Sequence, residues 1–439
     1  MHPVPGGGIS RCDAGAFPLN VARMSLEIRT LTSPDELPAW FRAVAVGFLR
    51  SPEVSDEEAA ARAPGIELAR TQGAFDGDRC VGTFRTTPQQ LTLPGGASLP
   101  SCAVTNVTVS PTHRRRGLLS QMMARALTAA KERGDAMASL ISAEYPIYGR
   151  YGFGPAAWVA EWEVETARAG LDPRHSGPAD GGSVRFADAD EVLAVGPELY
   201  ERYRGQPHRQ GVIDRTGRWW RQLAGRHRYP GDQFTMPFFA VHRDADGEVQ
   251  GLVVYSVKEH WATKLPENTV EVSSLTALTP AAERALWQFV LSIDWVARVR
   301  SGFRAPDDVL PLLLPDPRAA RMQTVADFLW LRPLDVPRLL ESRSYGMPGT
   351  LVLDLHDAAG LAGGRYRLEA GPEGAVCEPC DADFDLSLEI GELGTLLLGD
   401  ESAVRLAALG RAEERREGAA ASADALFRTS RRAWCPDVF

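Results

Sequence analysis

Three consecutive arginines followed by a glycine, at positions 114 to 117, are the residues whose types and spacing most clearly suggest chemistry. They stand between a β-branched segment, residues 104–109, and a segment whose apolar residues recur at helical spacing up to Gly134. The first N–H groups of a helix lack intrahelical partners and the helix dipole is positive there, so such a turn attracts anions. Arginines add charge, and a glycine lets a phosphate approach the backbone. The pattern predicts a pyrophosphate-binding loop.

The alternative interpretation of this arginine run is a solvated charge cluster. The order of elements argues against it, because a strand, Pro111, the basic turn, Gly117 and an amphipathic helix follow one another. The apolar stripe of that helix comprises Leu119, Met122, Met123, Ala126, Leu127 and Ala130.

A second group with chemical potential is a set of tyrosines, Tyr145, Tyr148 and Tyr151, in a segment interrupted by glycines. A phenol has a pKa near 10, so it is protonated at neutral pH and can donate a proton to a leaving thiolate of comparable basicity. The alternative is that all three are packing aromatics.

Metal and redox chemistry find little support in the sequence. The six cysteines are scattered, and the CxxC pair Cys377–Cys380 has no second ligand pair at zinc-site spacing. A turn between two strands is the expected place of this pair. The eight histidines lie in no strong motif, and His113 is expected to be solvated. The sequence therefore predicts no metal.

Composition narrows the class of protein further. A net charge of −9 argues against general nucleic-acid binding, although it permits a cationic substrate. No apolar run has the roughly 18 residues of a membrane helix. The first 23 residues lack the apolar region of a signal peptide. They are expected to form a flexible leader, or to be an over-long start with Met24 as the natural first residue, and the expected compartment is the cytoplasm.

The elements that position these residues are expected to form an α/β domain over residues 24–172, because strands alternate with helices there. Its first helix carries Trp40, Phe41, Val44 and Phe48 as an expected core stripe. A linker rich in Pro, Gly, Ser and Asp follows at residues 173–183.

A degraded repeat of this domain is expected over residues 173–318. The hairpin glycines Gly82 and Gly251 are 169 positions apart (251 − 82), and so are Pro111 and Pro280 (280 − 111). The second copy has Glu283, Ala285 and Leu286 in place of Arg114, Arg116 and Gly117. An acid repels phosphate and a leucine blocks the backbone, so this copy is predicted to keep the fold and to have lost the cofactor site.

Residues 319–439 change character and form the third predicted domain. Alternating strands and short helices predict an antiparallel sheet covered by helices. The chain ends with Trp434-Cys-Pro-Asp-Val-Phe439, a short apolar tail that could dock a terminus. Asp437 within it either attracts a polycationic substrate or is merely solvated.

Two motifs give this chain a resemblance to a known family. The string Val109-Ser-Pro-Thr-His-Arg-Arg-Arg-Gly-Leu-Leu119, followed by Ile147-Tyr-Gly-Arg-Tyr-Gly-Phe-Gly-Pro155, resembles the Eis-type aminoglycoside acetyltransferases of the GNAT superfamily. Leu119 departs from the general GNAT pattern, which has Gly or Ala there. The resemblance implies two tandem GNAT-like domains and a C-terminal domain like the sterol carrier proteins, an α/β fold overall.

The resemblance also implies roles for individual residues. Tyr148, in the Ile-Tyr-Gly-Arg motif, corresponds to the general acid, and the carboxylate of the terminal Phe439 to the general base. Acetyl-CoA is the implied cosubstrate, and the assembly is implied to be a homohexamer. The implied acetyl-CoA contacts are Val107, Thr108, Val109, Arg114, Arg115, Arg116, Gly117, Leu118, Leu119, Ser120, Ala143 and Glu144.

The expected function is acetyl-CoA-dependent N-acetylation of aminoglycoside-like polyamines, at one or several amines, giving antibiotic resistance. Alternatives within the superfamily are protein lysines, peptides or a biosynthetic amine. A different class of function is a non-catalytic protein that binds lipid or another small molecule through its C-terminal domain. Retention of the arginine loop, which the second copy has lost, argues against that alternative.

Overall fold

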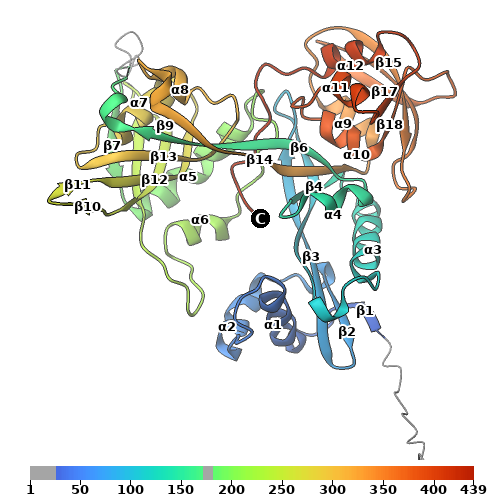
Figure 1. Ribbon diagram of the computed structural model, residues 1–439, viewed down its shortest axis with the longest axis horizontal. Coiled ribbons are helices and arrows are strands. Elements are labelled where there is room, and N and C mark those ends of the chain that lie inside the picture. Colours follow the sequence, from blue (N-terminus) through green and yellow to red (C-terminus); the bar gives the residue numbers. More distant parts are fainter. Residues whose placement is uncertain (1–25, 172–180) are drawn as a thin grey trace, which may run out of the picture.

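The computed structural model describes residues 26–171 and 181–439, so the predicted leader and most of the predicted linker lie outside the described residues. The strands that build the large sheet are β1 (Leu26–Thr30), β2 (Thr71–Asp76), β3 (Arg79–Thr92), β4 (Ser98–Val109), β5 (Met137–Ile141), β6 (Gly154–Glu165), β7 (Ser183–Ala187), β8 (Phe238–Arg243), β9 (Val249–Lys258), β12 (Asn268–Ala277), β13 (Val296–Arg304) and β14 (Ala320–Pro333). These strands form one continuous twelve-stranded sheet in the order β1-β2-β3-β4-β5-β14-β6-β13-β12-β9-β8-β7 (Figure 1).

Two smaller sheets contain the remaining strands. The short hairpin strands are β10 (Trp261–Ala262) and β11 (Leu265–Pro266), and the five-stranded sheet contains β15 (Gly349–His356), β16 (Gly364–Gly371), β17 (Gly374–Pro379), β18 (Leu386–Glu389) and β19 (Ala412–Glu414). The helices are α1 (Leu37–Gly47), α2 (Asp56–Arg62), α3 (Leu118–Glu132), α4 (Tyr145–Tyr148), α5 (Ala189–Arg204), α6 (Gly217–Leu223), α7 (Pro280–Leu291), α8 (Leu310–Leu313), α9 (Val336–Ser342), α10 (Ile390–Leu396), α11 (Ala403–Ala408) and α12 (Ala419–Phe427). Among the described residues, no helix has the length and apolarity needed to cross a membrane.

The N-terminal part of the sheet is covered on both faces. Side chains alternate between the faces of a strand, so Ala74 of β2 packs in the core beneath α3 while its neighbour Phe75 packs with α1. Trp40 and Phe41 of α1 are buried, as predicted, but Phe48 is 45% exposed because α1 ends at Gly47. The antiparallel hairpins β2–β3 and β3–β4 turn after Asp76 and after Thr92.

Strands β4 and β5 separate within the sheet. They are parallel and pair only between residues 101–103 and 137–139. Beyond Ala103, the described pairings of β4 are with β3 alone, on its other side. The edge of residues 104–109 that faces β5 is therefore open, and the pyrophosphate loop predicted from the sequence begins where this open edge ends.

Strand β14 joins the N-terminal and central parts of the sheet. It pairs antiparallel with β5 on one side and with β6 on the other, and Figure 1 shows it running along β6 across the molecule. The C-terminal domain that we predict from residue 319 onward therefore begins with a strand of the large sheet. The smaller five-stranded sheet begins only with β15.

The C-terminal part differs from the sequence prediction in two details. Its sheet is not purely antiparallel, because β15 and β18 pair in parallel. The CxxC pair does not form a turn: Cys377 is a buried residue of β17 and Cys380 directly follows that strand. Cys377 pairs in register with Leu368 of β16, which is also buried. The strand therefore continues through most of the CxxC sequence, and Cys377 packs on the buried face of the sheet.

Candidate active site

The arginine loop has the geometry of an anion site. Pro111–His113 form a single 3-10 turn, Arg115 and Gly117 have φ of +63° and +76°, and α3 begins at Leu118 with no side chain capping it. The left-handed conformation at Gly117 favours glycine. Because the first helical N–H groups need partners from outside the helix, this uncapped end can bind a pyrophosphate.

The three arginines of the loop are available to a ligand. Arg114, Arg115 and Arg116 are exposed, and within the described part of the chain none of them lies within 4.0 Å of a carboxylate oxygen. One contact is internal, in which Arg116 Nη2 donates to Thr112 O at 3.4 Å. The residues present therefore fit a polyanionic cosubstrate.

His113 is not solvated, so that prediction is wrong. Its side chain is buried, with Nε2 3.2 Å from Asp76 Oδ2 and Nδ1 2.8 Å from Thr112 Oγ1. Asp76 lies at the tip of the β2–β3 hairpin, which is far away in sequence. His113 thus ties the loop to this hairpin and helps to fix the backbone around it.

A bulge interrupts β4 just before the loop. The register with β3 shifts between the pairs Thr83↔Thr108 and Arg85↔Thr105, and Asn106 within the bulge has φ +51°. Thr83 Oγ1 donates to Asn106 O at 2.8 Å and lies 2.7 Å from Thr108 Oγ1. Val107 lies in this bulged segment of the open edge, with Thr108 and Val109 after it.

Thr83 and Gly47 support the bulge, and sequence reasoning missed both residues. Thr83 is fully buried, and a Cβ at Gly47 would lie only 2.3 Å from the Cβ of Thr108. Only a glycine at position 47 therefore lets α1 lie this close to β4. Neither residue stands in a motif, so nothing in the sequence indicates this role.

Tyr148 is the last residue of α4 and is buried. Its ring makes an edge contact with Phe153 at 6.2 Å, and among the described residues its hydroxyl has no hydrogen-bond partner. Burial raises the pKa of the Tyr148 phenol, and Glu144 and Tyr151 raise it further. The Tyr148 phenol is therefore protonated at physiological pH.

The neighbouring tyrosines have different surroundings. Tyr145 is 49% exposed and packs edge-on against Trp330, whereas the Tyr151 hydroxyl lies 3.1 Å from Ser120 Oγ in α3. Ala143 and Glu144 are exposed in the connection between β5 and α4.

The loop, the bulge and Tyr148 belong to one structural unit. Leu118, Tyr148 and Val104 lie in a single apolar core, against which Val107, Val109 and Leu119 also pack. Phe439 packs instead against the larger core that extends into the central and C-terminal parts. Figure 1 places the C-terminus in the middle of the molecule, so the tail brings its carboxylate to the centre from outside the N-terminal domain.

The C-terminal tail is held by polar contacts. Trp434 N donates to Gln210 O at 3.1 Å, and Gly211, with φ +92°, has the Trp434 backbone 2.9 Å from the position of its missing Cβ. Asp437 is buried against Arg215, with Nε–Oδ2 and Nη2–Oδ1 distances of 3.0 Å, and its Oδ2 accepts from Tyr200 at 3.1 Å. Asp437 is therefore neither free for a substrate nor solvated, which corrects both sequence-based interpretations. It anchors the tail.

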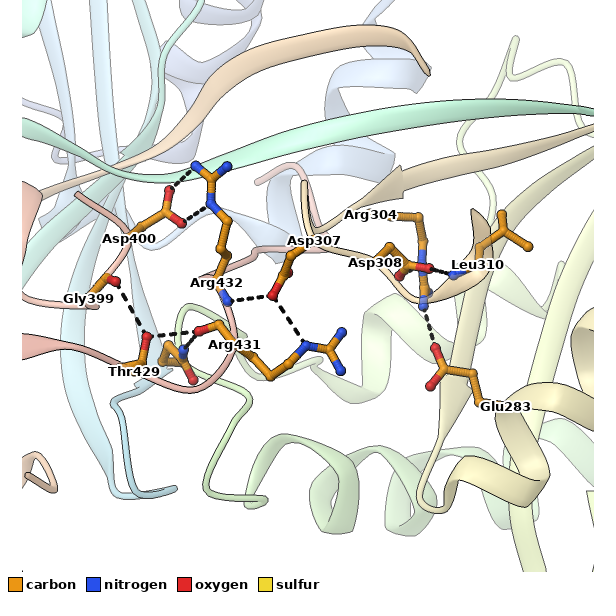
Figure 2. Close-up of polar contacts among 11 residues, drawn as sticks. Glu283, Arg304, Asp307, Asp308, Leu310, Gly399, Asp400, Thr429, Arg431 and Arg432 are labelled. Atoms are coloured by element: carbon orange, nitrogen blue, oxygen red, sulfur yellow. Dashed lines mark hydrogen bonds and ion pairs between the residues drawn. The ribbon is translucent and has the colours of Figure 1, made fainter. Parts of the chain in front are cut away.

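The counterpart of the arginine loop in the central part is closed. Thr279 caps α7 by accepting from Ala282 N, and Leu286 is fully buried. Glu283 is not an exposed acid: it lies 3.0 Å from Arg304 Nη2, as Figure 2 shows, and burial raises its pKa, with Asp308 contributing. The same Arg304 donates from Nε to Asp308 at 2.8 Å. This helix end has no free place for a phosphate.

The described residues offer no candidate metal site. Within residues 26–171 and 181–439 there is no group of three or more His, Cys, Asp or Glu side chains arranged to hold a metal ion.

Comparisons with known proteins agree with this architecture. Models described as "Acetyltransferase (GNAT) domain" match residues 27–156 and 211–333, and a "Sterol carrier protein domain" model matches residues 336–436. N-acetyltransferase Eis of Mycobacterium tuberculosis is 34% identical over 87% of this chain and 92% of its own. The chain belongs to the Eis-type GNAT N-acetyltransferases. The predicted order of two GNAT domains and a sterol-carrier-like domain is confirmed.

Two further relatives support the membership in the Eis-type family. The crystal structure of Eis1 from Mycobacterium abscessus superimposes with a TM-score of 0.80 at 30% identity, covering 94% of this chain and all of that one. A protein named an uncharacterized N-acetyltransferase, from Streptomyces avermitilis, is 59% identical over 92% of this chain and 96% of its own. This Eis-type chain is therefore an N-acetyltransferase of the acyl-CoA-dependent GNAT fold, with one open and one closed helix N-terminus.

Proposed function

We propose that this Eis-type enzyme uses acetyl-CoA to acetylate amines of aminoglycoside-like polyamines, at one or several positions, and thereby gives resistance to these antibiotics. One observation carries the use of acetyl-CoA: an uncapped helix end with three arginines free of carboxylates directly follows the open edge of β4. The resemblance in the two sequence motifs carries the aminoglycoside substrate.

In this proposal the N-terminal domain binds the whole cosubstrate. The residues Arg114, Arg115, Arg116, Gly117, Leu118, Leu119 and Ser120 hold the pyrophosphate through side-chain charge and backbone N–H groups. The open edge at Val107, Thr108 and Val109 binds the acyl group and the pantetheine arm through backbone groups. Ala143 and Glu144 contact the cosubstrate from the end of β5.

Two proton transfers accompany acetyl transfer. The Phe439 carboxylate accepts a proton from the substrate amine, whose nitrogen then forms the C–N bond while the C–S bond breaks. Tyr148 donates its phenolic proton to the departing sulfur. Burial favours this role for Tyr148, because it keeps the phenol protonated.

The terminal carboxylate is a weak base in water, with a pKa of about 3.5. It needs either burial, which raises its pKa, or a water relay. In the described part of the chain no Arg, Lys or His nitrogen lies within 4.0 Å of it. The Asp437–Arg215 anchor two residues before it holds the tail in place.

The test is CoA release from acetyl-CoA with a panel of aminoglycosides, using protein with an untagged C-terminus. Release with several of them, and products with more than one acetyl group by mass, would support the proposal. Saturable acetyl-CoA binding without release would keep the cosubstrate and move the search to protein lysines, peptides or biosynthetic amines. Absence of acetyl-CoA binding would favour the non-catalytic alternative. A cytoplasmic homohexamer is proposed on the resemblance alone, and sedimentation velocity tests the oligomer.

A further inference from the structure

The loop that follows Tyr148 borders a cavity on one side. Gly149–Tyr151 form a 3-10 turn, Gly152 has φ +82°, and β6 begins at Gly154. Residues 149–153 line a cavity of about 440 Å³, and among the described residues no atom lies within 4 Å of the position that a Cβ of Gly149 would occupy. The position of this loop, and of Tyr148 at its start, therefore depends on the contacts of its other side.

Arg332 of β14 makes a hydrogen bond to the loop backbone on that side. Its Nε donates to Tyr151 O at 3.3 Å, and its side chain is fully buried. A Cβ at Gly152 would lie 3.1 Å from the same Nε, so a glycine at this position lets the guanidinium lie against the loop. The Tyr151 hydroxyl lies 3.1 Å from Ser120 Oγ in the first turn of α3. Tyr151 thus connects Arg332 to the helix whose N-terminus we propose to bind the pyrophosphate.

The C-terminal domain holds both Arg332 and the end of the loop. Asp357, which directly follows β15, accepts from Arg332 Nη2 at 2.7 and 2.8 Å with its two carboxylate oxygens. Helix α10 of the same domain lies beside β14 and β6 (Figure 1). A Cβ at Gly154 would overlap the carbonyl oxygen of Gly391 in α10, so a glycine there lets the helix lie against the loop end. The loop is therefore fixed by Arg332 and by the C-terminal domain.

The contacts that fix the loop also set the place of the Tyr148 phenol. A proton donor has to lie within hydrogen-bonding distance of the departing sulfur, and a displacement of about 1 Å can lower the rate about 100-fold. We infer that Arg332 is a positioning residue for acetyl transfer, which holds the loop at Tyr151 O and thereby directs the Tyr148 phenol toward the cosubstrate. Asp357 and α10 are the contribution of the C-terminal domain to this positioning. The inference rests on the proposed function, in which Tyr148 protonates the leaving thiolate.

The kinetic test compares the same substitution at two buried arginines. Arg332→Lys keeps a positive charge beside Asp357 but removes the Nε donor to Tyr151 O. Arg343→Lys is the matched control, because Arg343 is also buried and donates from Nη2 to Phe427 O at 2.8 Å within the C-terminal domain. CoA release with the fastest-reacting aminoglycoside of the panel gives kcat and KM. We expect Arg332→Lys to lower kcat about 10- to 100-fold at a nearly constant KM for acetyl-CoA, and Arg343→Lys to leave kcat unchanged.

Two further variants separate positioning from folding. If Arg332 acts through the phenol, the double variant Tyr148→Phe/Arg332→Lys should have the same kcat as Tyr148→Phe alone, whereas independent effects would multiply. Gly391→Ala places a methyl group 3.0 Å from Phe153 O and so displaces the loop without changing Arg332. It should lower kcat in the same way, and it decides the test if Arg332→Lys does not fold.

Hydrogen–deuterium exchange gives a measurement that needs no amine substrate. Peptides that contain residues 149–154 should exchange faster in Arg332→Lys than in the wild type and in Arg343→Lys, because the loop loses its hydrogen bond to β14. Equal exchange of these peptides in the wild type and in both variants would contradict the inference.

The outcomes separate this inference from the proposed function. An unchanged kcat in Tyr148→Phe contradicts the proposed proton donor, and the inference fails with it. If Tyr148→Phe lowers kcat but Arg332→Lys does not, or if the losses multiply in the double variant, only the inference is wrong. If no aminoglycoside gives CoA release, the exchange rates of residues 149–154 decide whether Arg332 holds the loop.

Discussion

The unpartnered hydroxyl of Tyr148 leads to the first prediction. Tyr148→Phe removes the proton donor and keeps the ring that packs against Phe153, so kcat should fall by about 100-fold or more while the KM for acetyl-CoA stays nearly constant. Steady-state kinetics measure both values. If Tyr145→Phe lowers kcat and Tyr148→Phe does not, the role belongs to Tyr145.

The pKa of Tyr148 sets the sign of the pH dependence. Because burial disfavours the phenolate, its pKa lies above the ordinary value of about 10, and Tyr148 deprotonation should not reduce kcat below that pH. A loss of kcat between about pH 8 and 9 that disappears in Tyr148→Phe would contradict this assignment.

At the scale of residues, contiguous motifs could be predicted from sequence and long-range partners could not. The loop from Arg114 to Gly117 was predictable because adjacent residues carry all of its chemistry. His113 was misjudged because its partner Asp76 lies on a distant hairpin. Thr83 of β3 and Gly47 of α1 are far apart in sequence and meet at Thr108 of β4. No spacing rule connects such residues.

Helices α3 and α7 hold equivalent places in the two GNAT domains but differ at their first turns. Gly117, with φ +76°, leaves α3 uncapped, whereas Thr279 caps α7. Gly117→Ala should destabilise the protein by about 1 kcal/mol through backbone strain and should also weaken acetyl-CoA binding, because the loop must change shape. Thermal unfolding and calorimetric titration measure the two effects.

A matched control exists on the same helix. Gly134, just past the end of α3, has φ +80°, and among the described residues no neighbouring atom lies within 4 Å of the position that its Cβ would occupy. Gly134→Ala therefore meets the same backbone strain far from the loop. It should lower stability comparably and leave acetyl-CoA affinity unchanged. Equal acetyl-CoA affinities of Gly117→Ala and Gly134→Ala would show that the loop geometry does not contribute to cosubstrate binding.

At the scale of elements, the repeat predicted from sequence identified β12 and α7 as the counterparts of β4 and α3. Local patterns could not reveal which strands pair. Strand β14 inserts between β5 and β6. The alternation of its apolar and polar residues predicts a strand but does not show which strands it pairs with.

The contact between the large sheet and the C-terminal domain depends on a buried ion pair. Arg332 Nη2 lies 2.7 Å from Asp357 Oδ1, with side-chain exposures of 0% and 2%. Asp357→Ala leaves an uncompensated buried charge, so unfolding free energy should fall by about 3–5 kcal/mol in denaturant titrations. Asp383→Ala, which breaks an exposed pair with Arg415 at 3.4 Å, should change it by less than about 1 kcal/mol. Similar effects of both variants would contradict a special role for the pair.

The same pair contributes to acid stability. Burial raises the pKa of Asp357, but the hydrogen bonds and charge of Arg332 outweigh this and leave it lowered. Its stabilisation is therefore complete above the unfolded-state pKa of about 3.9 and is lost as the pH falls through the lower folded-state value. The wild type should lose this contribution below about pH 4, whereas Asp357→Ala should not.

The docked tail predicts sensitivity to C-terminal extension. Residues added after Phe439 convert its carboxylate into an amide, so activity should drop strongly even if the Asp437–Arg215 anchor keeps the fold. CoA release and a circular dichroism spectrum measure activity and fold. Full activity in a folded, extended protein would exclude the terminal carboxylate as the base.

The insertion of β14 has a consequence for synthesis on the ribosome. The end of β6 at Glu165 and the start of β14 at Ala320 are 155 positions apart (320 − 165), so translation at roughly 5–20 residues per second leaves the space between β5 and β6 unfilled for about 8–30 s. During that time the nascent chain exposes two unpaired strand edges, which invite aggregation. We expect stalled nascent chains to resist protease in their N-terminal domain only once β14 has emerged. Resistance in shorter chains would show that this domain matures before its last strand exists.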